Sequence, residues 1–350
     1  MSLEFSHIAH AYGATPALND VSFTAPLGEI TCLLGASGCG KSTLLGLAAG
    51  LLSIQSGRIA LGGETLAGPG LNPPPEKRPV GLVFQDGALF PHMSIAKNIA
   101  FGLPKARRMD DAGEIETWLA RVGLGGLGDR YPHELSGGQQ QRAALARAMA
   151  PEPAILLMDE PFASVDIVLR RALRRECRIL LRERQTTTVL VTHDPDEALD
   201  IADRIAVMEA GRIVQFGTPQ ELYNAPLAPS VGAIFGGAQI VRATFKDGAY
   251  ESVFGRWAAD CVLGDPPEED TTLDILVQAR ALRLDRDREG LAVRDVHPLG
   301  ARARVLLRHP SGAELTAEVP QSAGDHIRPG ALYRVKPDPA SVRAFAVRDV

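Results

Sequence analysis

A glycine-rich segment near the amino terminus has the composition of a phosphate-binding loop. Residues 35–42, GASGCGKS, match the pattern G-x-x-x-x-G-K-[ST] and lie between an apolar run, ITCLLG, and a helical run, STLLGLAAG. Glycine lets backbone N–H groups turn toward phosphate oxygens, and the amino terminus of a helix adds partial positive charge. Lys41 would reach the outer phosphates, and the Ser42 hydroxyl would bind Mg²⁺. The other predicted members of this site are Gly35, Ser37, Gly38, Cys39, Gly40 and Thr43.

Two adjacent acids follow a second apolar run, AILLMDE. The run has the composition of a buried parallel strand, so its last residues would lie at the edge of a sheet. Asp159 is the predicted Mg²⁺-binding carboxylate, acting directly or through water. Glu160 is the predicted general base for an attacking water, a role that contributes about 10²–10⁴ in rate. Two acids can also begin an ordinary loop, and the phosphate loop upstream is what favours the catalytic interpretation.

A second helix start also has the composition of an anion site. Residues 134–150, ELSGGQQQRAALARAMA, begin with a serine and two glycines and continue as a helix. Ser136 and the N–H groups of Gly137 and Gly138 could face an anion at the positive end of that helix. The alternative is a plain serine cap that satisfies the helix's own N–H groups.

The elements that must position these motifs alternate between strands and helices. Apolar and β-branched runs bounded by turns predict strands, and amphipathic runs predict helices. This order predicts an α/β fold with a mostly parallel sheet covered on both faces. Strands are expected at 3–12, 21–35, 56–63, 80–85, 154–160, 187–193 and 204–217, helices at 41–52, 110–122, 138–150, 166–184 and 195–202, and a proline-rich surface loop at 68–79.

The sequence changes in character near residue 237. From there on, polar and apolar residues alternate, with turn residues every eight to twelve positions, which predicts a small all-β unit such as a barrel. The expected domains are therefore 1–236 and 237–350.

The overall composition is that of an ordinary globular protein. The chain has 350 residues, 45% of them hydrophobic and 23% charged, and a formal net charge of −5 that argues against a nucleic-acid partner. Its four cysteines are scattered, as expected in a reducing compartment. The amino terminus lacks the features of a signal peptide, and no apolar run has the length of a membrane span. We therefore expect a soluble protein that works at a membrane only through partners.

Together these motifs resemble the ATP-binding subunits of ABC transporters. LSGGQ, at 135–139, is similar to the family's signature motif, and VFQD contains Gln85 where the family has its Q-loop. DEPFASVD resembles the run from the Walker B motif to the D-loop, with valine at 165 where leucine is common. VTHD contains His193 at the place of the switch histidine, and Tyr12 matches an aromatic residue that stacks on adenine. The resemblance covers residues 1 to about 236 and implies a P-loop NTPase fold that binds ATP and Mg²⁺.

The resemblance implies a role for each matched residue. Tyr12 would stack on the base, and Gln85 would contact Mg²⁺ and the attacking water. His193 would contact the γ-phosphate. Two subunits would close head to tail as a homodimer, so that Ser136, Gly137, Gly138 and Gln139 of one meet ATP bound to the other. Asp166 would contact the opposite subunit.

The same resemblance indicates a branch of the family. QDGALFPHMSIAKNIAFGL follows the Q-loop, where the coupling helices of a permease bind, and its Leu89, Phe90, Pro91 and Met93 suit such a groove, although local packing is the alternative for each. The β-rich tail resembles a TOBE-type regulatory domain, but VQARALRL departs from its usual Arg-Pro-Glu stretch. This branch imports iron(III), polyamines, sulfate, molybdate, thiamine or sugars, and the wording of QQQR and DEPFASVDIVLR favours iron(III). The implied protein is a peripheral ATPase on the cytoplasmic face of the membrane, served by permease subunits and an extracytoplasmic solute-binding protein.

Two other functions stay open at this point. The first is a soluble ABC-type ATPase that works on nucleic acid or ribosomes without a permease. The arginine-rich helix at 166–184 is its only support, and arginine runs on amphipathic helices are usually solvated faces. The tail could be a separate module for a small anion or metal, but His297, His309 and His326 are dispersed in the sequence. Co-purification with an integral membrane protein separates the importer from the soluble ATPase.

Overall fold

The apolar runs next to the chemical motifs form neighbouring strands of one sheet. In this computed structural model the strand order is β10-β9-β3-β8-β7-β6, and all neighbours pair in parallel except β10, which is antiparallel to β9. β8 is buried along its whole length, as a strand covered on both faces must be. The strands are β3 (Ile30–Leu34), β6 (Val80–Val83), β7 (Ile155–Asp159), β8 (Thr187–Thr192), β9 (Arg204–Glu209) and β10 (Arg212–Gly217).

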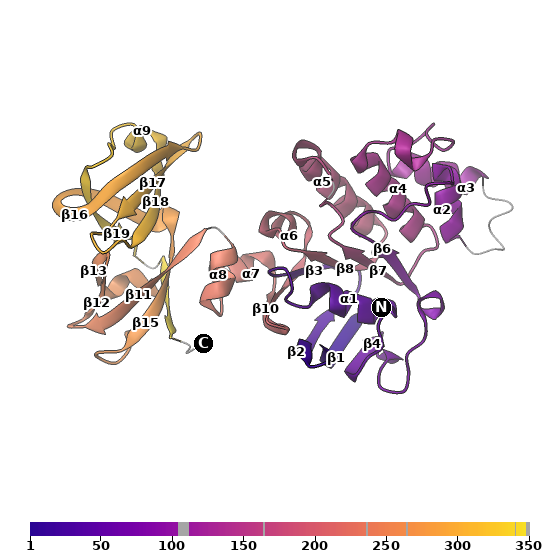
Figure 1. Ribbon diagram of the computed structural model, residues 1–350, viewed down its shortest axis with the longest axis horizontal. Helices are drawn as coiled ribbons and strands as arrows, with labels where there is room; N and C mark the ends of the chain where they lie inside the picture. Colours follow the sequence, from indigo (N-terminus) through magenta and orange to yellow (C-terminus); the bar gives the residue numbers. More distant parts are fainter. Residues whose placement is uncertain (104–111, 164, 236, 264, 340, 348–350) are drawn as a thin grey trace. The chain divides into compact units, whose positions relative to one another are not determined.

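Helices cover both faces of this sheet (Figure 1). α1 packs against β7 and β8, α6 packs against β3 and β8, and α4 packs against β6. α5 contacts both α4 and α6, so it links the helix of the second predicted anion site to the helix after His193. The helices are α1 (Lys41–Ala49), α2 (Ile95–Gly102), α3 (Ala112–Arg121), α4 (Gly137–Met149), α5 (Ile167–Glu183) and α6 (Pro195–Ile201).

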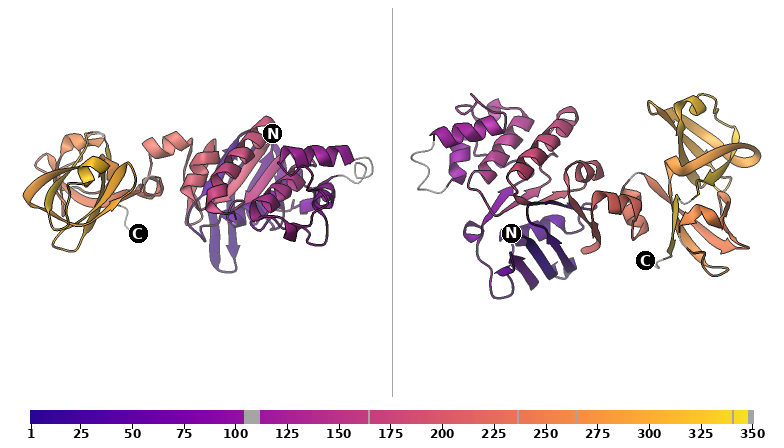
Figure 2. Two further views of the ribbon diagram at one scale, coloured as in Figure 1. Left: turned by 90° about the horizontal axis from the view of Figure 1, so that it is seen from above. Right: turned by 180° about the vertical axis from the view of Figure 1, so that it is seen from behind.

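A separate antiparallel sheet lies on the other side of α1, with the order β2-β1-β4-β5 (Figures 1 and 2). The sequence predicted β1 and β4 but not β5, and its expected strand at 21–35 is in fact the end of β2 and the whole of β3, which belong to different sheets. One core joins the two sheets through α1, because Leu44 and Leu47 share it with Phe5 and Leu157. The strands are β1 (Leu3–Tyr12), β2 (Thr15–Ala25), β4 (Ser56–Leu61) and β5 (Glu64–Ala67).

Two further local predictions need correction. The run at 204–217 forms a hairpin and not one strand, because Ala210 and Gly211 both have positive φ, 46° and 77°, as a two-residue type I′ turn requires. The expected surface loop at 68–79 contains a short 3-10 turn at Pro75–Lys77 and a buried arginine, Arg78.

The structure describes residues 1–103, 112–163, 165–235, 237–263, 265–339 and 341–347. Residues 110 and 111 of the expected helix at 110–122, and Ser164 of the D-loop run, lie outside them. Among the described residues, no helix is both long and apolar enough to span a lipid bilayer. The chain divides into two compact units, Met1–Leu222 and Tyr223–Val350, so the division precedes the change of sequence character at 237.

The second unit is mostly β-structure. Its strands form two sheets, with the orders β13-β12-β11-β15-β20-β14 and β18-β17-β16-β19. The sheets share one core, to which Ile275 and Val305 contribute from opposite sheets. The elements are α7 (Pro219–Asn224, across the division), α8 (Pro229–Ile234), β11 (Ala238–Lys246), β12 (Ala249–Ser252), β13 (Gly255–Ala258), β14 (Val262–Leu263), β15 (Thr272–Gln278), β16 (Leu282–Pro298), β17 (Arg302–Arg308), β18 (Glu314–Pro320), α9 (Gln321–Gly324), β19 (Leu332–Pro337) and β20 (Val342–Ala346).

Candidate functional site

The predicted phosphate loop connects the end of β3 to the start of α1. Gly40 precedes the helix with φ of 105°, and a Cβ at this position would lie 2.5 Å from the carbonyl oxygen of Ala17. Only glycine fits there. The Lys41 ammonium is 5% exposed and donates to the carbonyl oxygens of Gly35 and Ala36, both at 2.8 Å. The loop therefore holds a buried cation through its own backbone, at the amino terminus of α1.

Ser42 and Asp159 lie together beside this loop. The Ser42 hydroxyl donates to Oδ1 of Asp159 at 3.2 Å, because β3 and β7 both flank β8 and end at the same edge of the sheet. Burial raises the pKa of the Asp159 carboxyl, the hydrogen bond from Ser42 opposes this rise, and the charge of Glu160 adds to it. Hydroxyl and carboxylate oxygens are ligands that Mg²⁺ prefers, with its other positions left for water and phosphate. The two residues therefore fit the predicted cation.

Glu160 and His193 form a second pair at the same edge. They directly follow the neighbouring strands β7 and β8, and Oε1 of Glu160 lies 3.0 Å from Nδ1 of His193. The Glu160 backbone has φ of 42°, a conformation that non-glycine residues rarely adopt and that often marks functional sites. Its N–H donates to the carbonyl oxygen of Val191 at 2.9 Å. The fold thus aims a carboxylate and an imidazole at each other beside the phosphate loop.

Tyr12 and Gln85 lie near the rim of the loop. The Tyr12 phenol oxygen is 3.4 Å from the Thr43 hydroxyl, and 53% of the residue is exposed. An aromatic face beside a phosphate site can stack on a base. Gln85 is exposed two residues beyond β6, at the edge where β7 and β8 also end.

The second predicted anion site lies elsewhere in the chain. Ser136 caps α4 as half of a capping box, because its Oγ accepts from the N–H of Gln139 and the Gln139 amide oxygen accepts from the N–H of Ser136. The plain cap that the sequence left open is therefore present. Within the described residues, no hydrogen bond or ion pair joins Ser136–Gln139 to the phosphate loop. Asp166 is exposed directly before α5.

The segment after Gln85 is tied to α4. Arg147 of α4 donates to the carbonyl oxygens of Gly87 and Ala88, at 2.9 and 2.7 Å, and its guanidinium lies over the Phe90 ring. Pro91 is exposed and lines a hollow of about 600 Å³ whose other walls come from residues 126–134. Leu89, Phe90 and Met93 are half-buried, which agrees in part with local packing, and they do not line this hollow.

Sequence reasoning missed one buried arginine of α5. The helix was interpreted as a solvated basic face, but Arg174 is only 6% exposed. Its guanidinium lies 2.5 Å from an oxygen of Asp194 and 3.3 Å from an oxygen of Glu197. The helical spacing of Arg174 with the buried Cys177 and Leu181 was the signal that could have found it.

The dispersed histidines of the tail do not gather into a metal site. Within the described ranges, the structure holds no group of three or more His, Cys, Asp or Glu side chains that could bind a metal ion. All four cysteines are free and buried.

Comparison with known proteins finds matches along the whole chain. The ABC transporter family profile matches residues 18–163, and the TOBE domain profile matches residues 277–345. The sulfate/thiosulfate import ATP-binding protein CysA 2 of Chromobacterium violaceum is 41% identical, covering 97% of this chain and 93% of its own. The Fe(3+) ions import ATP-binding protein FbpC 1 of Rhizobium meliloti is 38% identical, covering 99% and 93%. The solved structure of cbiO1 from Clostridium perfringens, part of the ABC transporter complex cbiONQ, has a TM-score of 0.57 at 29% identity and covers 67% of this chain and 94% of that one.

Proposed function

The chain belongs to the ABC transporter family, and we propose that it is the ATP-hydrolysing subunit of a binding-protein-dependent importer. The observation that carries this proposal is the contact of Glu160 with His193 beside the pair formed by Ser42 and Asp159. Phosphoanhydride hydrolysis requires a base, an imidazole that contacts phosphate and a cation site. Groups suited to all three lie at one edge of this sheet.

Each residue of this edge has a distinct task in the proposed reaction. Lys41 exchanges its bonds to loop carbonyls for bonds to the β- and γ-phosphates, while the loop N–H groups hold the phosphate oxygens. Ser42, Asp159 and Gln85 hold Mg²⁺, which neutralises phosphate charge when bound. Glu160 takes a proton from the attacking water, and His193 donates to the γ-phosphate.

A second copy of the chain is needed to complete the site. Ser136 and Gly137 are exposed at the start of α4. Among the described residues, this helix packs against α2, α3, α5 and β6 and not against the phosphate loop of its own chain. We propose that two copies close head to tail, so that Ser136–Gln139 of one contact the γ-phosphate held by the other and Asp166 contacts the opposite subunit. Tyr12 supplies the stacking face for adenine.

The proposed importer also needs a permease, which would dock beside the phosphate site. The hollow lined by Pro91 and by polar side chains such as Asp129 and Arg130 would receive a helix of the permease, and Arg147 connects the segment of Pro91 to α4. The chain would lie at the cytoplasmic face of the membrane, where an extracytoplasmic binding protein delivers solute to the permease from the other side.

For the solute, we propose iron(III). The sequences QQQR and DEPFASVDIVLR favour iron(III). The two relatives are named for the import of Fe(3+) ions and for the import of sulfate and thiosulfate. Polyamines, thiamine, molybdate and sugars are the remaining alternatives of this branch. Purification of the native complex, followed by reconstitution with each solute and its binding protein, identifies the one that stimulates hydrolysis.

The test of the ATPase proposal is Glu160→Gln. This variant should bind ATP as tightly as the wild type, hydrolyse it at least about 10²-fold more slowly, and accumulate a dimer at saturating Mg-ATP. Glu152→Gln is the matched control. Glu152 precedes the first residue of β7, at the end of the strand remote from Glu160, so this substitution should leave turnover unchanged. Full turnover by Glu160→Gln would refute the proposed site. Light scattering that finds only monomers of this variant would refute the proposed dimer.

A chain found only in the cytosol, without an integral membrane partner, would favour the soluble ATPase.

A further inference from the structure

Arg174 connects two helices that begin beside proposed site residues. α5 starts directly after Asp166, and α6 starts two residues after His193. From the third turn of α5, the Arg174 guanidinium contacts oxygens of Asp194, at 2.5 Å, Glu197, at 3.3 Å, and Asp200, at 3.5 Å. All three acids belong to α6 or its cap. One buried cation therefore fastens the start of α6 to α5.

Asp194, the residue next to His193, is held from three sides. Its Oδ1 accepts the N–H groups of Asp196 and Glu197 and so caps α6, while its Oδ2 accepts from Arg174. Its own N–H donates to the Thr192 hydroxyl at 3.0 Å. The His193 side chain is 56% exposed, so packing contributes little to its direction. The direction of the imidazole then depends on its contact with Glu160 and on the backbone beside Asp194 from which the side chain projects.

We propose that Arg174 is a positioning residue that holds Asp194 so that the His193 imidazole reaches Glu160 and the γ-phosphate. This inference rests on the proposed function, because it assumes that His193 acts on bound nucleotide. Arg174 itself touches neither Glu160 nor the phosphate loop within the described residues.

The energetics favour positioning over stability as the reason for this buried charge. Arg174 and Glu197 are both buried. Taking an arginine and a carboxylate out of water costs several kcal/mol per ion, and well-packed apolar residues often serve stability equally well. Burial raises the pKa of Glu197 to about 7 even though Arg174 opposes the rise. The groups facing Glu197 are Arg174 and Cys177 of α5, Asp194 before α6, Cys32 of β3 and Thr192 of β8. The cluster thus keeps an ion pair in a place where ionisation is costly.

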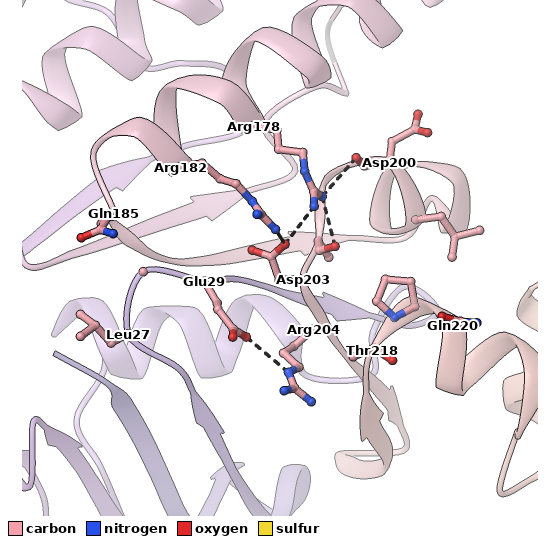
Figure 3. A pocket seen from close by; sticks show the side chains of 14 residues that line it. Leu27, Glu29, Arg178, Arg182, Gln185, Asp200, Asp203, Arg204, Thr218 and Gln220 are labelled. Carbon is pink, nitrogen blue, oxygen red and sulfur yellow. Dashed lines mark hydrogen bonds and ion pairs between the residues drawn. The ribbon is translucent and has the colours of Figure 1, made fainter.

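Arg178 provides a matched control one turn later on α5. It donates to the carbonyl oxygens of Ile201 and Ala202, at 2.5 and 3.2 Å. It also donates to Oδ1 of Asp203 at 2.9 Å (Figure 3). These contacts fasten the carboxyl end of α6 to α5. Arg178→Met therefore removes a comparable link between the same two helices, but at the end remote from His193.

The experiment compares the full-length variants Arg174→Met and Arg178→Met in ATP hydrolysis, alone and combined with His193→Ala. Arg174→Met should lower kcat by about 10-fold or more, as misplacement of a catalytic group does, with the KM for ATP changed less than about twofold. Arg178→Met should leave kcat within about twofold. In the His193→Ala background, Arg174→Met should cause no further loss, because residues that act as a unit are not additive. Single-turnover assays keep the slow variants measurable.

Two further variants keep the test decisive if Arg174→Met does not fold. Asp194→Asn retains a good helix cap but removes the charge that Arg174 binds, and it should lower kcat as Arg174→Met does. Arg174→Lys retains the charge and should recover most of the activity. Equal losses in Arg174→Met and Arg178→Met, or an additive loss in the His193→Ala background, would overturn the inference. A wild type without ATPase activity would instead overturn the proposed function.

Discussion

The buried Glu197 predicts an unusual dependence of stability on pH. Burial raises the pKa of this carboxyl from its ordinary value of 4.5 to about 7, and the residue is 4% exposed. Between these two values the folded chain binds a proton that the unfolded chain has lost. The free energy of unfolding therefore falls as pH rises through this window and levels off above about 7. Glu197→Gln replaces the carboxyl by a neutral amide of the same shape and removes the effect.

The shift also gives the size of the effect. One pKa unit corresponds to 1.36 kcal/mol, so the full shift amounts to roughly 3 kcal/mol. Between pH 5.5 and pH 8.5 the wild type should lose about 2 kcal/mol of stability relative to Glu197→Gln. Arg174 keeps Asp194 and Asp200 as partners in the variant, so the comparison leaves its charge paired.

Urea denaturation of both proteins at several pH values measures this difference. Other carboxylates titrate equally in the two proteins and cancel when the two unfolding free energies are subtracted. The unfolding free energy of the variant minus that of the wild type should rise from pH 5.5 to about pH 7 and level off above it. A value that stays constant from pH 5.5 upward would show that the Glu197 carboxyl is already ionised at pH 5.5 and would refute the reasoning.

The remaining predictions concern the phosphate loop, the second helix start and one buried cation. Gly40→Ala should abolish ATP binding in equilibrium titrations, because its Cβ would collide with a backbone oxygen at 2.5 Å; normal binding would contradict the loop geometry. Gly138→Ala should have the same unfolding midpoint as the wild type, since its Cβ meets only a methyl group at 3.9 Å. It should nevertheless slow ATP hydrolysis, and unimpaired turnover would remove Gly138 from the proposed site. Alkylation of Cys39 should inhibit the ATPase slowly, because Cys39 is only 7% exposed, and bound ATP should protect it in a mass-spectrometric time course; modification without inhibition would contradict this. Arg78→Met should cost about 2–4 kcal/mol of unfolding free energy, since Arg78 is buried and donates to two carbonyl oxygens at the end of α1; a loss below about 0.5 kcal/mol would fall within the range of ordinary surface substitutions.

Local patterns in the sequence predicted the elements that bear the site. The α/β fold and the all-β tail are confirmed, and strands end where the motifs of Lys41, Asp159 and His193 begin. These features depend on short windows of the chain: a glycine turn, an apolar run, a helix cap. The steric and hydrogen-bonding rules that decide them act over a few residues, so they can be predicted without knowledge of distant contacts.

Long-range packing decided the rest. The order of strands, with β8 between β3 and β7, brings Ser42 to Asp159 and Glu160 to His193 across more than thirty residues of chain. The burial of Arg174 follows from the face that α5 presents to α6, which its many arginines conceal in the sequence. The sequence by itself determined which groups could do chemistry and where most of the strands and helices that bear them lie. Only the tertiary structure determined which of them meet, because strand order and helix contacts depend on burying apolar surface from the whole chain at once.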